Sequence, residues 1–110
     1  MSEDVQNFID ETVKEHPVVL FMKGTAQMPQ CGFSARAVQI LRAVGLKEVV
    51  TINVLDDDDV REGIKVYANW PTIPQLYIKG EFVGGSDIMA EMFESGELEK
   101  TLRDEKVLSD

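Results

Sequence analysis

Cysteine is almost absent from the sequence, which contains a single one, Cys31, among 110 residues. A single cysteine cannot form a disulfide within the chain, so we expect a reducing compartment. Histidine also occurs once, as His16. One cysteine and one histidine supply too few ligands for a zinc site. Together these scarcities exclude a disulfide scaffold and a structural zinc module.

Basic residues are scarce too, and this limits the classes of partner. The chain has 11 Lys and Arg against 20 Asp and Glu, for a formal net charge of −9. This charge repels nucleic acid and anionic lipid, so we expect neither as a partner. Long apolar runs are also missing. The longest, such as VVLFM at residues 18–22, have the length of a strand and cannot cross a bilayer.

The first residues, MSEDVQNFIDETVKEH, lack the apolar core of a secretory signal and the arginines of a transit peptide. We therefore expect either that the protein stays where it is made or that an organellar presequence has been removed. Hydrophobic residues make up 44% of the chain and charged residues 28%. This composition and length predict one globular domain over residues 1–110.

Hydrophobic periodicity predicts alternating helices and strands. The expected elements are a helix over residues 3–15, a strand over 18–22, a helix over 31–44 and a strand over 49–54, then a helix opened by aspartates 56–59, a hairpin of strands 75–78 and 82–84, a helix capped by 85–87, and a short terminal turn around Leu98 and Leu102. This order predicts an α/β fold about one small mixed sheet, with a parallel βαβ unit, a hairpin and a covering helix. The four aspartates are expected to form a solvated turn and helix cap.

Cys31 occupies a position that suits reactive chemistry. It follows a polar loop containing Pro29 and begins a predicted helix, so its sulfur should lie among unpaired backbone N–H groups. Those donors and the helix dipole stabilise a thiolate and lower its pKa, and Lys23 adds a positive charge nearby. An isolated cysteine is more often a buried, inert residue. The placement instead favours a reactive thiolate or a metal ligand.

Ser34 stands where a dithiol redox protein of the C-x-x-C type has its second cysteine. Serine cannot resolve a mixed disulfide on Cys31, so an external thiol would have to release it. Ser34 is equally compatible with a plain first-turn helix residue.

A cysteine hydrolase would instead need a base within hydrogen-bond reach of Cys31. His16 precedes the strand that Cys31 follows, and five extended residues separate the strand ends by roughly 16 Å, so we reject that interpretation.

The segment WPTIP, residues 70–74, is a second marker of a site. Pro74 lies just before a predicted strand, so we expect a cis Ile73–Pro74 bond, with a rigid loop as the alternative. A cis turn would leave the N–H and C=O of Ile73 free to pair with an extended peptide.

Gly84-Gly85-Ser86-Asp87 offers another helix N-terminus. Its backbone donors can hold a carboxylate, and Asp87 can hold an ammonium group. Ser86 and Asp87 can equally serve as plain helix caps that bind no ligand. The sequence leaves both interpretations open.

Taken together, MKGTAQMPQCGFS, NWPTIPQLYIKGEFVGGSD and the strand order resemble the monothiol glutaredoxins of the single-domain CGFS class (glutaredoxin-5-like). The resemblance covers the chain from about Val5 to Leu102. It implies a thioredoxin fold, with a small four-stranded mixed sheet flanked by helices. C-G-F-S alone is a weak signal, and Lys23, WPTIP and GGSD at these spacings make it specific.

The resemblance implies that glutathione binds across the site, with Cys31 as the catalytic and metal-binding residue. Carried over by position, Lys23 and Arg61 would bind the glycine carboxylate, with Lys65 as a helper. Ile73 would bind the cysteinyl backbone. Ser86 and Asp87 would hold the γ-glutamyl end. Many relatives have a second cysteine in place of Ser86, sometimes implicated in a disulfide with the active-site cysteine. That route is closed here.

The resemblance leaves two functions open. Family members in mitochondria, plastids and bacterial cytoplasm carry or transfer 2Fe-2S clusters, often together with BolA-type proteins, and many are poor at the usual glutaredoxin reduction. The first candidate is therefore a carrier of a glutathione-ligated 2Fe-2S cluster in iron–sulfur protein biogenesis. The alternative is a glutathione-dependent thiol–disulfide oxidoreductase that deglutathionylates proteins, at most a weak enzyme. On the resemblance, we favour the carrier.

A ligand count refines that expectation. A 2Fe-2S cluster takes four ligands, usually thiolates, and this chain supplies only Cys31. Two chains with one glutathione each would complete the set, which predicts a cluster-bridged homodimer and a monomeric apo form. Other expected partners are iron–sulfur assembly and recipient proteins, including BolA-type proteins. The expected location is the mitochondrial matrix in a eukaryote or the cytoplasm in a bacterium.

Overall fold

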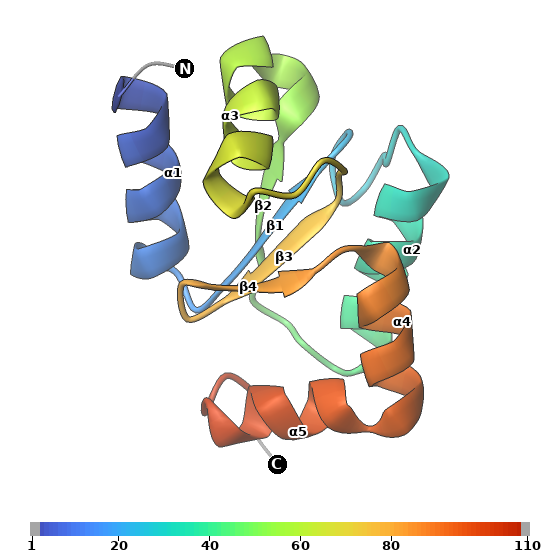
Figure 1. Ribbon diagram of the computed structural model, residues 1–110. Helices are drawn as coiled ribbons and strands as arrows, with labels where there is room; N and C mark the ends of the chain where they lie inside the picture. Colours follow the sequence, from blue (N-terminus) through green and yellow to red (C-terminus); the bar gives the residue numbers. More distant parts are fainter. Residues whose placement is uncertain (1–2, 109–110) are drawn as a thin grey trace.

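The computed structural model describes residues 3–108, which form a four-stranded sheet between two layers of helices (Figure 1). In chain order the elements are α1 (Glu3–Glu15), β1 (Val18–Met22), α2 (Gly32–Ala43), β2 (Val50–Asn53), the 3-10 turn η1 (Val54–Asp56), α3 (Asp58–Ala68), β3 (Gln75–Ile78), β4 (Glu81–Gly84), α4 (Ser86–Ser95) and α5 (Glu97–Asp104). None of the helices in this described part is long and apolar enough to cross a membrane.

The sheet has the strand order β2-β1-β3-β4. β1 runs parallel to β2 and antiparallel to β3, and β3 runs antiparallel to β4. The predicted combination of a parallel βαβ unit and a hairpin is therefore confirmed. The hairpin turns at Lys79 and Gly80, whose φ angles of 53° and 83° give the two positive values of a tight turn that matches strand twist.

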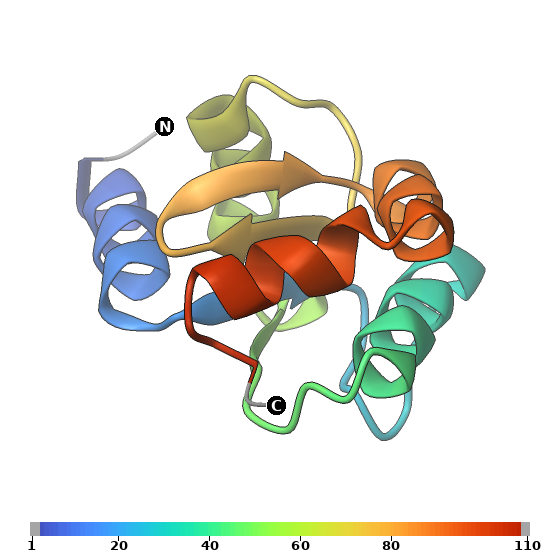
Figure 2. The same cartoon turned by 90° about the horizontal axis from the view of Figure 1, so that it is seen from below.

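β1 is the centre of the core and uses its two faces for different helices. Val18, Leu20 and Met22 pack into the cluster that contains residues of α2, α4 and α5. Val19 and Phe21 pack into the cluster formed with α1 and α3. Figure 1 shows these two groups of helices on opposite sides of the sheet, and Figure 2 shows α5 lying across one face beside α4. The alternation follows from the period of two along a strand.

Near the aspartate run the end of the second strand differs from the prediction, whereas the start of the third helix agrees with it. The second strand ends at Asn53, because the Asn53 side chain accepts the Leu55 N–H (3.0 Å) and starts the turn η1, which takes in Val54. The third helix begins at Asp58, since Asp57 caps it by accepting backbone N–H groups of its first turn. Residues 56–59 are exposed, as expected for a solvated turn and cap.

The prediction of a short terminal turn was wrong, because residues Glu97–Asp104 form the helix α5. Leu98 and Leu102, one turn apart, are fully buried against the sheet. On the exposed side an ion pair joins Lys100 to Asp104 (2.8 Å), also one turn apart. Helical spacing of both the apolar and the charged pair stabilises this segment as a helix.

Candidate functional site

The sheet register brings three chain segments to the end of β1. Gln75, the first residue of β3, lies opposite Phe21 of β1, so the loop of residues 69–74 reaches the point where β1 ends. Gly84, the last residue of β4, lies opposite Leu76, so the start of α4 arrives at the same place. The loop after β1 leads back into α2. Two helix N-termini and one loop therefore meet at Lys23.

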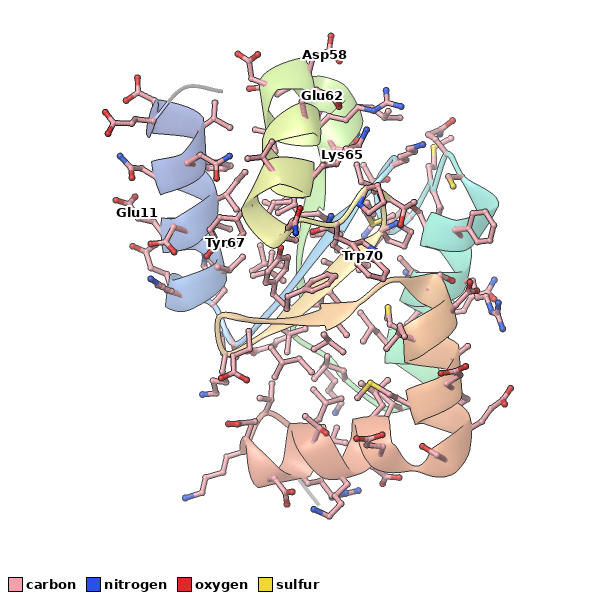
Figure 3. All side chains as sticks on the ribbon, in the orientation of Figure 1. Glu11, Asp58, Glu62, Lys65, Tyr67 and Trp70 are labelled. Carbon is pink, nitrogen blue, oxygen red and sulfur yellow. The ribbon has the colours of Figure 1, made fainter. Side chains whose placement is uncertain are left out.

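A cavity of about 380 Å³ opens where these segments meet. The predicted site residues that line it are Lys23, Cys31, Lys65, Ile73, Ser86 and Asp87. Arg61 is the exception: it lies one turn before Lys65 on α3 and does not line the cavity. Figure 3 shows Lys65 and Trp70 on the side of α3 that faces α2, while Tyr67 lies on the side of α1. Lys65, predicted as a helper, is thus the α3 cation that lines the cavity.

Cys31 is the N-cap residue of α2, with extended backbone (φ −153°, ψ 136°), rather than the first residue inside the helix. Its side chain is half-buried. The backbone N–H of Ser34 is the main cause that lowers the pKa of the thiol, with smaller contributions from the Phe33 N–H, the charge of Lys23 and the Ser34 hydroxyl, while burial opposes them. The helix N–H groups therefore lower the pKa of the thiol more than the charge of Lys23 does.

The loop between Lys23 and Cys31 is closed by a short antiparallel bridge between Gly24 and Pro29. The Gln30 N–H donates to the Lys23 carbonyl (2.9 Å), which brings the residue before Cys31 back to the end of β1. Gly24 has a φ of +91°, and a Cβ there would lie 2.6 Å from both the Gln30 nitrogen and the Met28 oxygen. The turn therefore requires glycine, and it holds Lys23 and Cys31 together.

Ser34 is a structural residue of the site. It is fully buried, and its hydroxyl oxygen accepts the backbone N–H of Lys23 (3.0 Å). This bond joins the first turn of α2 to the end of β1. The plain first-turn interpretation therefore missed a contact between segments, which no local sequence pattern reveals.

The Ile73–Pro74 bond is cis, as predicted. Among residues 3–108 neither the N–H nor the carbonyl of Ile73 has a hydrogen-bond partner. Gly85 allows α4 to begin close to this loop, since a Cβ on it would lie 3.2 Å from the Pro74 oxygen. The backbone of Ile73 is thus available beside the N-termini of two helices.

At the start of α4 the N-cap residue is Gly85, and no side chain of the described residues caps the helix. The plain-cap interpretation of Ser86 and Asp87 is therefore wrong. Ser86 is only 6% exposed, and its Oγ has no hydrogen-bond partner within the described part of the chain. The Asp87 side chain is largely exposed and lies 3.8 Å from Arg36 of α2. One buried hydroxyl and one exposed carboxylate therefore line the α4 side of the cavity.

His16 lies before β1 and lines another cavity, with Lys79 and Lys106. It is at the opposite end of β1 from Lys23, so the rejection of a cysteine hydrolase stands. In residues 3–108 no group of three or more His, Cys, Asp or Glu side chains is placed to hold a metal ion. Cys31 is thus the thiolate that this part of the chain offers to a metal.

Apolar residues of the site were missed at the sequence level. Phe33, Trp70 and Ile88 line the cavity and are exposed. The Trp70 ring packs on Phe82 of β4, with ring centroids 5.6 Å apart. Apolar residues in helical or strand patterns are normally assigned to the core. For Trp70 its place beside Pro71, outside any predicted element, was the available signal.

Comparisons with known proteins agree with this geometry. Residues 18–83 match the family model described as Glutaredoxin. The chain is 54% identical over 111 residues to the mitochondrial monothiol glutaredoxin-5 of Schizosaccharomyces pombe, covering 99% of this chain and 76% of that protein. It is 53% identical over 102 residues to an uncharacterized ycf64-like monothiol glutaredoxin of Synechocystis, covering 93% and 94%.

A solved structure matches the whole arrangement of elements. The solution structure of a monomeric truncated mutant of Trypanosoma brucei 1-C-Grx1 superimposes with a TM-score of 0.85 at 47% identity. The match covers 94% of this chain and 93% of that one.

Proposed function

The chain belongs to the monothiol glutaredoxins, and on that premise we propose that it binds and transfers a glutathione-ligated 2Fe-2S cluster in iron–sulfur protein biogenesis. One observation carries the proposal. The lone thiol, Cys31, has a lowered pKa and opens into a cavity whose wall offers polar groups that have no partner among the described residues. A thiolate of this kind is a metal ligand, and such a wall suits a small thiol peptide beside it.

The lining of the cavity matches the chemistry of glutathione from end to end. Lys23 and Lys65 provide positive charge for the glycine carboxylate, and Arg61 is proposed as a further cation from outside the lining. Ile73 offers an N–H and a C=O that are free of partners in the described part of the chain, and these suit the cysteinyl backbone. This arrangement would place the glutathione thiol beside Cys31.

The γ-glutamyl end meets the start of α4. Within residues 3–108 Ser86 Oγ is buried without a partner, and leaving such a hydroxyl unsatisfied costs about 1–3 kcal/mol. A ligand carboxylate at this helix N-terminus would accept a hydrogen bond from the Ser86 hydroxyl and remove that cost. Asp87 would hold the ammonium group, in competition with Arg36, which lies 3.8 Å away in the free protein.

The cluster is the cargo of the protein, and its four ligands set the assembly. One cysteine per chain means that two chains give two thiolates. A glutathione in each cavity supplies the other two. Because half of the ligands are exchangeable small molecules, the cluster can be passed on to a recipient. We propose iron–sulfur assembly and recipient proteins as partners, including BolA-type proteins, in a reducing compartment such as the mitochondrial matrix or a bacterial cytoplasm.

The alternative function uses the same thiolate. The lowered pKa of Cys31 also suits attack on a glutathione mixed disulfide, and Ser34 requires that a second glutathione release the product. Deglutathionylation by a weak oxidoreductase therefore remains the competing proposal.

The visible spectrum of protein purified without oxygen in the presence of glutathione tests the proposal. We expect the absorption bands of a 2Fe-2S cluster, with iron and sulfide each at one per chain, which corresponds to one cluster per two chains. Cys31→Ser should abolish the colour, and the matched variant Ser34→Ala should keep it. Colourless wild-type protein that reduces a glutathionylated substrate would contradict the carrier function and favour the alternative.

A further inference from the structure

The side chain of Gln75 is fully buried next to the loop that lines the cavity, and the function proposed above does not use it. Its Nε2 donates to the carbonyls of Trp70 and Thr72, both at 3.2 Å, and its Oε1 accepts the hydroxyl of Tyr77 at 3.0 Å. Burial of an amide is unfavourable unless its polar atoms are paired, and here protein groups pair them. Gln75 therefore joins the start of β3 to two points of the loop that precedes it.

The bond to Thr72 determines where one backbone donor points. In a trans peptide group the C=O and the N–H of the next residue point in opposite directions. The Thr72 carbonyl points towards Gln75, so the Ile73 N–H of the same peptide plane points away from it. Gln75 does not line the cavity, whereas Thr72 and Ile73 do.

The bond to Trp70 has a different consequence. The residue after Trp70 is Pro71, which has no N–H, so this bond anchors the loop without orienting a donor. The single donor oriented by the Gln75 amide is therefore that of Ile73.

We propose that Gln75 is a positioning residue that aims the Ile73 N–H at the backbone of a peptide ligand in the cavity. The inference rests on the proposed function for the identity of that ligand, glutathione. Gln75 acts through the loop and does not itself touch the ligand.

Two variants separate this role from a contribution to stability. Gln75→Met keeps the length of the side chain and removes both donors to the loop. Tyr77→Phe removes the third hydrogen bond of the same buried amide and keeps both loop bonds. Gln75→Met should weaken glutathione binding roughly fivefold or more, because about one well-oriented hydrogen bond to the ligand is lost. The glutathione affinity of Tyr77→Phe should stay within about twofold of wild type. The pH midpoint of Cys31 alkylation should be unchanged in both, because neither residue contacts the thiol.

Calorimetric titration of each protein with glutathione, together with thermal melting, gives the comparison. Equal affinities for wild type and Gln75→Met would overturn the inference. The inference would also be overturned if both variants lost glutathione affinity in proportion to their loss of melting temperature.

A measurement on the wild-type protein tests the same point without a variant. The backbone amide resonance of Ile73 should shift on saturation with glutathione. If glutathione binds and this resonance does not shift, the Ile73 N–H does not point at the ligand and the inference is wrong, whereas the proposed binding of glutathione is retained. If wild-type protein binds no glutathione at all, the proposed function fails first.

Discussion

At the scale of single residues, Ser34 connects the chemistry of the thiol to the fold. Its backbone N–H is the main cause of the lowered pKa of Cys31, and its side-chain oxygen accepts the N–H of Lys23. The folded-state pKa of the thiol lies below its ordinary value, so the thiolate stabilises the folded protein. That contribution is present above the ordinary pKa of a thiol and is lost as the pH falls through the lowered value.

The pH dependence of Cys31 alkylation tests this view of the thiol. The rate should reach half its maximum below about pH 8.5, the ordinary pKa of a free thiol. Lys23→Ala should raise the midpoint only slightly, because the helix N–H of Ser34 contributes more than the Lys23 charge. Lys65→Ala is the matched control: Lys65 also lines the cavity but is not among the causes of the shift, so the midpoint should stay in place. A wild-type midpoint at or above that of a free thiol would contradict the site.

At the scale of elements, the loop between β1 and α2 is as important to the site as the helix itself. The bridge between Gly24 and Pro29 and the bond from Gln30 to Lys23 shape this loop into a tight turn. The loop places Cys31 at the N-cap of α2 and keeps Lys23 close to Cys31. The position of the thiol therefore depends on backbone geometry before the C-G-F-S motif begins.

Two glycine substitutions on either side of Cys31 should behave in opposite ways. Gly24→Ala puts a Cβ against backbone atoms at a φ of +91°, so we expect a loss of about 1–3 kcal/mol in unfolding free energy. Gly32→Ala, in the first turn of α2, meets nothing within 4 Å and should be neutral or slightly stabilising. Urea unfolding of both variants measures the difference. Equal stability of the two would show that the tight turn does not constrain the loop.

At the scale of the whole molecule, the charge and the placement of the site shape the expected assembly. The chain carries a net charge of −9, which makes two copies repel each other at long range. Phe33 and Ile88 are exposed at the cavity and give a small apolar rim around Cys31. Two side chains alone cover too little area for a stable interface, so we expect two copies to associate at this face only with a bridging group between them.

We therefore predict that dimerisation follows the cluster. Holo protein should elute as a dimer with two glutathiones, and apo protein and Cys31→Ser should elute as monomers under the same conditions. Removal of glutathione from the holo form should release the cluster and dissociate the dimer, because two of the four ligands are lost. Sizing chromatography with glutathione assays follows each step. A cluster retained by a monomer, or a dimer that persists without the cluster, would contradict the model.

The sequence by itself determined the order of the helices and strands from α1 to α4 and most of the predicted residues that line the cavity. Strand period alone assigns Val19 and Phe21 to one face of β1 and Leu20 to the other, as found. The position of Cys31 at the N-cap of a helix also depends on neighbours along the chain. Local backbone chemistry decides such features, so a single sequence suffices to predict them.

Tertiary structure decided the features that depend on contacts between segments. Lys65 lines the cavity and Arg61 does not, although both lie on the same face of α3 one turn apart, because the packing of α3 on the sheet places the later turn beside the cavity. Ser34 has its hydrogen-bond role because the first turn of α2 packs against the end of β1. The Ser86 hydroxyl has no partner within residues 3–108 and does not cap α4, because Gly85 is the N-cap and starts the helix against the preceding loop. Residue spacing along the sequence does not predict these contacts, since they form only when segments far apart in the chain pack together.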